Sequence, residues 1–237
     1  VDGKLVPIPI NIETVNRLLG LNIKNGREMK KWLRRNTFKI KITEISINLD
    51  EAEEKARRIF KELGEKGVPN YYGEQRFGRD GDNWQKGLDI LNGKIKVYDR
   101  FLKGMYLSSV QSMMFNFYLS ERIKKGKFIE LIDGDVCKKT ETGGIFVSEN
   151  LEEDNERSKK NEISFTGPMF GDRFMGPREG SESAVFEKEI LESFSLTLEQ
   201  IKRLGDGTRR PGRIFIKNLD VQKDKDGLWV SFFLPKV

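Results

Sequence analysis

Histidine is absent from this sequence of 237 residues, and cysteine occurs once, at Cys137. Without histidine, these residues cannot form a Ser-His-Asp or Cys-His nucleophile system or a histidine-rich zinc site. Any chemistry within them must use carboxylates, lysine, tyrosine, hydroxyls or backbone groups. A single cysteine cannot form an internal disulfide, which favours a reducing compartment, the cytoplasm.

Long apolar runs are also missing, since none approaches the roughly 18 to 20 residues that a membrane-spanning helix requires. The first ten residues do not begin with methionine and lack the basic and apolar regions of a signal peptide. We therefore expect no membrane association, and we expect the sequence to begin inside a longer protein. Its length allows one large domain or two modest ones.

The charge is moderately basic, with 43 Lys and Arg against 37 acidic residues, a net charge of +6. Such an excess is compatible with an RNA-facing patch but does not require one. A basic stretch over 24–35 would suit contact with phosphates, although a solvated charged face is the commoner explanation. Its cations are Lys24, Arg27, Lys30, Lys31, Arg34 and Arg35.

Hydrophobic periodicity predicts strands near both ends of the chain and helices between them. Phe38, Ile40 and Ile42 alternate with polar residues, which indicates a half-buried strand. Further strand-like runs cover 214–221 and 228–234. Helices are predicted over 50–64, 84–91, 108–125, 182–194 and 197–205. This order predicts an α+β fold, a sheet domain interrupted by a helical insertion.

Three connecting segments have distinctive compositions. Residues 67–83 contain three aromatic residues, two arginines and four glycines, which would suit a binding loop or a tight connector whose aromatics plug into the core. Residues 165–180, again rich in Gly, Pro, Arg and Phe, are a second candidate binding loop. The mixed-charge run 149–160 is predicted to be an exposed or mobile loop.

The predicted helix over 108–125 carries three polar residues that could act at a site, namely Gln111, Asn116 and Arg122. Caps or hydrogen bonds to neighbouring backbone are the more common use of such side chains.

Six motifs follow one another along most of the chain. They are Asn36 and Phe38 (Asn-x-Phe), GVPNYYGEQRFG at 67–78, SSVQSMMFN at 108–116 with Arg122 following, FTGPMFG at 165–171, GTRRP at 207–211 and LWVSFFLPK at 228–236. In this order they resemble the TruD family, the tRNA pseudouridine synthases D.

The resemblance implies a pseudouridine-synthase-type antiparallel sheet domain interrupted by a mainly helical TRUD insertion domain, with the active site in the cleft between them. Residues 1–66 and 211–237 would belong to the catalytic sheet domain and 67–210 to the insertion. It also implies an isomerase that needs neither a metal nor an organic cofactor. Its usual substrate would be the uridine at position thirteen of certain tRNAs, and related members modify other RNAs.

One motif of the family is missing from this sequence. The family's nucleophilic aspartate lies in a Gly-x-Lys-Asp-x-x-Ala motif upstream of Asn-x-Phe, and no such run occurs here. The family also continues beyond Leu-Pro-Lys. Either the sequence is part of a longer enzyme, which we favour, or it is a relative that has lost catalysis and kept RNA binding.

The resemblance and the residue types together give a set of predicted site residues. Phe38 would stack an extruded base and Asn36 would support it, the alternative being that Phe38 is only the first core residue of its strand. Gln75, Arg76 and Phe77 would line the same cleft, with Arg76 holding a phosphate or pairing with the aspartate. For Arg209, RNA binding and a structural ion pair are equally good interpretations. The predicted contacts to the RNA backbone are Lys30, Lys31, Arg34, Arg35, Arg79, Arg209 and Arg210.

Three classes of function follow from these observations. The first is an RNA-isomerising enzyme, the second a non-catalytic RNA-binding module, and the third a protein-interaction scaffold on the same fold. The complete reading frame and the salt dependence of tRNA binding distinguish them.

Overall fold

The computed structural model describes residues 35–235, and the chain divides into two compact units. The described part of the first, the sheet unit, comprises 35–60 and 216–235. The second, the insertion unit, comprises 61–215. This unit extends beyond the predicted insertion, 67–210, at both ends. It includes the last residues of the helix that ends at Lys66 and the short strand at 213–214, which pairs with residues 68–69.

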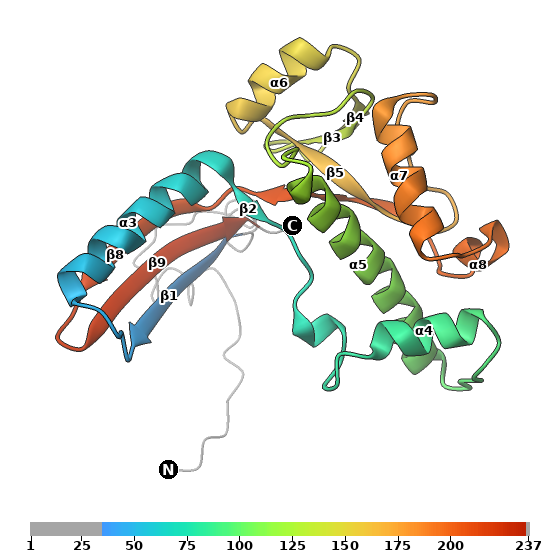
Figure 1. The fold of residues 1–237 in the computed structure, drawn as a ribbon, viewed down its shortest axis with the longest axis horizontal. Coiled ribbons are helices and arrows are strands. Elements are labelled where there is room, and N and C mark those ends of the chain that lie inside the picture. Colours follow the sequence, from blue (N-terminus) through green and yellow to red (C-terminus); the bar gives the residue numbers. More distant parts are fainter. Residues whose placement is uncertain (1–34, 236–237) are drawn as a thin grey trace, which may run out of the picture. The chain divides into compact units, whose positions relative to one another are not determined.

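The sheet unit is a three-stranded antiparallel sheet in the order β1-β9-β8, with helix α3 on one face (Figure 1). Buried Ala52 of α3 packs with Val221 of β8 and Leu228 of β9. β1 is an edge strand of this sheet, and its predicted apolar residues Phe38, Ile40 and Ile42 are 37%, 47% and 46% exposed. The elements are β1 (Arg35–Thr43), α3 (Leu49–Lys66), β8 (Lys217–Lys223) and β9 (Gly227–Pro235).

The insertion unit is built around a four-stranded antiparallel sheet in the order β4-β3-β5-β6, which the sequence did not predict. The long helix α5 lies along β5 and buries Phe115, Tyr118 and Leu119 against it and against α7 (Figure 1). The sheet contains β3 (Val136–Lys139), β4 (Ile145–Val147), β5 (Ile163–Met169) and β6 (Thr208–Pro211), and the helices beside it are α4 (Asn83–Leu91), α5 (Arg100–Lys124), α6 (Leu151–Lys159), α7 (Glu182–Ser193) and α8 (Leu198–Lys202).

Short elements complete the insertion unit. A two-stranded sheet pairs β2 (Val68–Pro69) with β7 (Arg213–Ile214), and a single 3₁₀ turn, η1, covers Glu74–Arg76. Arg213 is buried and donates hydrogen bonds to the carbonyl oxygens of Lys66 and Ser158, which ties the end of α3 into the insertion unit.

The predicted start of α8 is confirmed in detail. The hydroxyl of Thr197 accepts from Gln200 N, and the Gln200 side chain accepts from Thr197 N, so the capping box is complete. The predicted helices over 50–64 and 182–194 correspond to α3 and α7.

Three predictions about segments were wrong. Residues 163–169 form the fully buried strand β5, not the start of a binding loop. Residues 151–159 form helix α6, which Asn150 caps by accepting from Glu153 N. Helix α5 begins at Arg100, eight residues before the predicted start at Ser108, and Asp99 caps it by accepting from Leu102 N.

Two helical glycines give a matched test of the packing of α4 on α5. A Cβ at Gly87 would lie 2.4 Å from the carbonyl oxygen of Tyr106, whereas a Cβ at Gly104 meets nothing within 4 Å. Gly→Ala inside a helix ordinarily stabilises by about 0.8–1 kcal/mol. We expect Gly104→Ala to follow that rule and Gly87→Ala to lower the melting temperature, because backbone atoms cannot yield to the added methyl group. A stabilised Gly87→Ala would contradict this close approach of the two helices.

Candidate functional site

In the sheet unit, Phe38 forms a stacked pair with its neighbour across the strands, Phe232. Their ring centroids are 5.2 Å apart with an interplanar angle of 18°. Phe38 stays 37% exposed, so it is not enclosed as a core residue would be. An exposed ring held by a second ring is suited to stacking a planar ligand such as a base. Asn36 lies in β1 and pairs with Leu234 of β9.

In the insertion unit, polar side chains of α5 hold the segment that contains Tyr72 and Arg76. The Asn116 side chain accepts from Tyr72 N at 2.8 Å and donates to Tyr72 O at 2.9 Å, as a paired strand would. One turn earlier on α5, the Ser112 hydroxyl accepts from Arg76 Nε at 2.9 Å. Gln111 donates to the carbonyl oxygen of Phe170 at 2.7 Å and so fixes a second loop.

Two guanidinium groups share the ring of Tyr72. The guanidinium carbon of Arg210 lies 3.9 Å from the ring centroid, and that of Arg76 lies 5.4 Å from it. Arg210 is oriented by buried Asn70, since its Nη2 donates to Asn70 Oδ1 at 2.6 Å and its Nε donates to Asn70 O at 3.2 Å. We call Asn70, Tyr72, Arg76 and Arg210 the arginine cluster.

The electrostatics of the arginine cluster favour an anion. Burial lowers the pKa of Arg210, Tyr72 opposes that shift, and the positive charge of Arg76 adds to it. Within the described residues, neither Arg76 nor Arg210 has a carboxylate within ion-pair distance. Two adjacent cations without a counter-charge, beside an aromatic face, can bind a phosphate group through charge-assisted hydrogen bonds.

Two other arginines of the same unit, unlike Arg76 and Arg210, are each paired with a buried carboxylate in the core. Arg122 and Asp135 are both fully buried and paired, with Nη1 to Oδ1 at 2.9 Å. Arg209 donates to both carboxylate oxygens of buried Glu187, at 2.7 and 3.0 Å. Burial raises the pKa of Glu187, and Arg209 opposes that shift. Of the two interpretations of Arg209, the structure supports the ion pair. The predicted contact with RNA was wrong, because the Arg209 side chain is buried and already paired with Glu187.

The remaining predicted residues lie in several settings. Phe77 is only 8% exposed, so its ring plugs into the core and is not available for stacking, which corrects its predicted place in the wall of a cleft. Gln75, within η1, and Arg79, three residues after Arg76, are both exposed. Arg35 lies at the start of β1, whereas Lys30, Lys31 and Arg34 lie outside the described residues.

Sequence reasoning missed Asn70, counted Tyr72 only as one of the three aromatic residues of a candidate binding loop, and left Asn116 with an open role. Asn116 in fact bonds backbone, which was the commoner alternative. The sequence did contain a signal for this grouping. Asn70 and Tyr72 are two positions apart in the same motif as Arg76, and side chains two positions apart in an extended segment lie on the same side.

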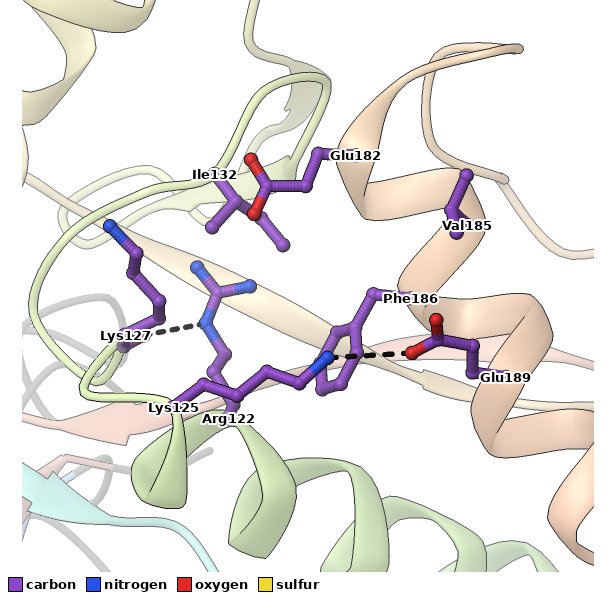
Figure 2. Close-up of a pocket in the computed structure, with 8 residues that line it drawn as sticks. All are labelled: Arg122, Lys125, Lys127, Ile132, Glu182, Val185, Phe186 and Glu189. Atoms are coloured by element: carbon purple, nitrogen blue, oxygen red, sulfur yellow. Dashed lines mark hydrogen bonds and ion pairs between the residues drawn. The ribbon is translucent and has the colours of Figure 1, made fainter.

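A small pocket lies elsewhere in the insertion unit, between the end of α5 and α7 (Figure 2). Its volume is about 90 Å³, far below the roughly 300–1,000 Å³ of ligand sites. Arg122, in its wall, donates to Lys127 O, and Lys125 pairs with Glu189 at 3.4 Å. Cations that are already bonded in so small a space do not form a nucleotide site.

The described residues contain neither a cluster of metal ligands nor a helix suited to span a membrane. No group of three or more His, Cys, Asp or Glu side chains is placed there to hold a metal ion. None of the helices in that part of the chain combines the length and the apolar character needed to cross a membrane.

Comparison with known proteins assigns the fold and then the family. The crystal structure of a candidate tRNA pseudouridine synthase D (TruD) from Methanosarcina mazei superposes with a TM-score of 0.69 at 18% identity, covering 85% of this chain and 65% of that one. This similarity shows that the chain has the same α+β fold as that protein. The family model described as tRNA pseudouridine synthase D (TruD) matches residues 24–98 and 91–236. The chain therefore belongs to the TruD family.

Individual relatives agree with this assignment. The tRNA pseudouridine synthase D of Thermus thermophilus is 37% identical over 220 residues, which is 93% of this chain and 60% of that protein. The protein of the same name from Anaeromyxobacter dehalogenans is 36% identical over 191 residues, 77% of this chain and 54% of the relative. The chain thus spans between one half and two thirds of the length of these relatives.

Proposed function

We propose that the complete protein is a tRNA pseudouridine synthase that isomerises a uridine at position thirteen of a tRNA. Membership of the TruD family, over most of this chain, is the observation that carries the proposal. In this reaction the bond between N1 and the ribose C1′ breaks and a bond between C5 and C1′ forms. The C5 proton leaves to solvent and N1 takes up a proton, so the product is an isomer of the substrate. The base keeps all its other atoms, so neither oxidant nor reductant is needed.

In this proposal, the arginine cluster holds a phosphate of the tRNA. Arg76 and Arg210 supply two cationic forks without a described counter-charge, and Tyr72 keeps them side by side. Such a clamp would fix one point of the tRNA backbone and so help to orient the substrate. Exposed Arg79, together with Arg35 at the start of β1, would add weaker electrostatic attraction.

Phe38 and Asn36 would bind the base itself. A uridine must leave its stack before an enzyme can reach its C5 and C1′, and an exposed aromatic ring can replace the stacking that the base gives up. The pair of Phe38 and Phe232 provides such a ring. The nucleophilic aspartate of the family has no counterpart in these residues, so we assign it to a part of the complete protein beyond them. The proposed compartment is the cytoplasm.

Release of tritium from tRNA labelled at uridine C5 tests this proposal, because only C5–C1′ bond formation displaces that hydrogen. We expect the complete protein to release one tritium per tRNA, and a tRNA with cytidine in place of uridine thirteen to give none. Tight tRNA binding without release would instead identify a non-catalytic RNA-binding relative. Release from the cytidine-substituted tRNA would contradict the proposed position.

A further inference from the structure

Residues 92–103, the connection between α4 and α5 together with the first turn of α5, expose two aromatic side chains almost completely. Tyr98 is 90% exposed and Phe101 is 84% exposed, more than any other large hydrophobic residue in the described range. Tyr98 precedes the Asp99 cap of α5 and Phe101 lies in the first turn, so both belong to one corner of the insertion unit (Figure 1). Large apolar surface held in water often marks an interaction site.

Cations flank these aromatics in the sequence, and most of them have no counter-charge among the described residues. Lys94 pairs with Asp89 at 3.4 Å, but Lys96, Arg100 and Lys103 meet no carboxylate within ion-pair distance in the described part of the chain. The one acidic residue of the segment, Asp99, uses its carboxylate to accept from Leu102 N at 2.7 Å. The corner is therefore strongly basic as well as aromatic.

We propose that Tyr98, Phe101, Lys96, Arg100 and Lys103 form a second RNA-binding surface, on which unpaired bases stack. We call these five residues the α4–α5 surface. The aromatics would take the bases and the cations the phosphates, which is the usual composition of a site for single-stranded RNA. The proposal rests on the proposed function only in taking tRNA as the RNA.

The charge pattern favours RNA over a protein partner. Lysine is depleted in protein interfaces, whereas lysine and arginine beside exposed aromatic rings are typical of sites that bind unpaired nucleotides. The surface is also distinct from the arginine cluster. Phe101 and Ser112, which binds Arg76, are eleven residues apart on α5, or about 16 Å along a helix. A nucleotide at one position does not occupy the other.

The test uses the complete protein with both aromatics replaced, Tyr98→Ala with Phe101→Ala, and measures its dissociation constant for tRNA. We expect binding to weaken by roughly tenfold or more, because each stacked base is worth about 1–3 kcal/mol and about 1.4 kcal/mol is tenfold. The slope of log affinity against log salt should not change, since an aromatic ring releases no counterions. Tyr98→Phe should bind tRNA as the wild type does.

A matched control and a charge variant make the test specific. Leu198 of α8 is 73% exposed and lies outside the surface, so Leu198→Ala should leave tRNA affinity unchanged. Lys96→Gln with Lys103→Gln should lower the salt slope by about 0.7–0.9 for each phosphate that the protein no longer neutralises. Wild-type affinity in the double alanine variant would overturn the proposal. So would a loss of self-association in that variant with unchanged tRNA affinity, which would assign the surface to a second copy of the chain.

Failure of this proposal and failure of the proposed function give different results. If the wild type released no tritium but the double alanine variant still bound tRNA more weakly, the α4–α5 surface would stand and the catalytic assignment would fall. If the wild type released tritium normally and the double alanine variant bound tRNA as tightly as the wild type, the catalytic assignment would stand and the α4–α5 surface would fall.

Discussion

Replacing Arg76 by alanine in the complete protein is expected to reduce turnover of tRNA by on the order of 100-fold or more, because a misplaced substrate reacts far more slowly than an oriented one. Arg76 is anchored to Ser112 and lies over Tyr72, so its charge is presented at a fixed point. It is one of several phosphate contacts, and affinity for tRNA should therefore fall much less than turnover. Single-turnover rates and binding constants, measured on the same preparation, separate the two effects.

Arg79→Ala is the matched control for this prediction. Arg79 follows Arg76 by three residues but is exposed and has no described partner. Its removal should lower affinity slightly and leave the single-turnover rate within about threefold of wild type. Arg76→Lys keeps the charge without the planar fork and should recover only part of the rate. A wild-type rate in Arg76→Ala would remove Arg76 from the site.

Replacing Asp135 by alanine is expected to destabilise the insertion unit by about 3–5 kcal/mol, since it leaves a buried, uncompensated charge. Asp135 accepts hydrogen bonds from Arg122, from Ile132 N and from the Ser183 hydroxyl, and it is fully buried. Its removal would leave two neutral donors, Ile132 N and the Ser183 hydroxyl, without this acceptor, in addition to the charge of Arg122. Thermal and urea unfolding of the two proteins measure the difference.

Two variants control for nonspecific damage. Glu121→Ala breaks an exposed pair with Lys124 on the same helix and should change stability by less than about 1 kcal/mol. Replacing both members, Arg122→Met with Asp135→Leu, should recover much of the stability, because an apolar pair needs no counter-charge. If Asp135→Ala were no worse than Glu121→Ala, the buried pair would not support the core as described.

Helices with a capping motif and strands with alternating apolar residues could be predicted from the sequence. A strand that is buried on both faces could not, because it has neither pattern. Thr197 with Gln200 fixes the start of α8 through bonds made within four residues, and the alternation of Phe38, Ile40 and Ile42 predicts β1. β5 gives no alternation because both its faces are buried, and it contains Gly167 and Pro168, which ordinarily argue against a strand. A Cβ at Gly167 would lie 2.7 Å from the Tyr118 ring, so the glycine is required by the packing of α5.

The adjacent arginines of β6 show why the site could be predicted only in part. Successive side chains of a strand point to opposite faces, which sends Arg209 to Glu187 in the core and Arg210 to Tyr72. In the sequence both lie in the run GDGTRRPGR at 205–213, whose Gly and Pro content is typical of a turn, and a turn gives no basis for separating the two. Likewise, Phe77 and Tyr72 are both aromatic residues of one motif, and only the tertiary structure buries the first and places the second under two cations.

The salt dependence of tRNA affinity tests most directly whether the arginine cluster binds phosphate. Arg76→Gln with Arg210→Gln should lower the slope of log affinity against log salt by about 0.7–0.9, the contribution of the one phosphate that the cluster neutralises. Arg58→Gln, an exposed change on α3, should leave the slope unchanged. An unaltered slope in the double variant, measured on folded protein, would contradict the account.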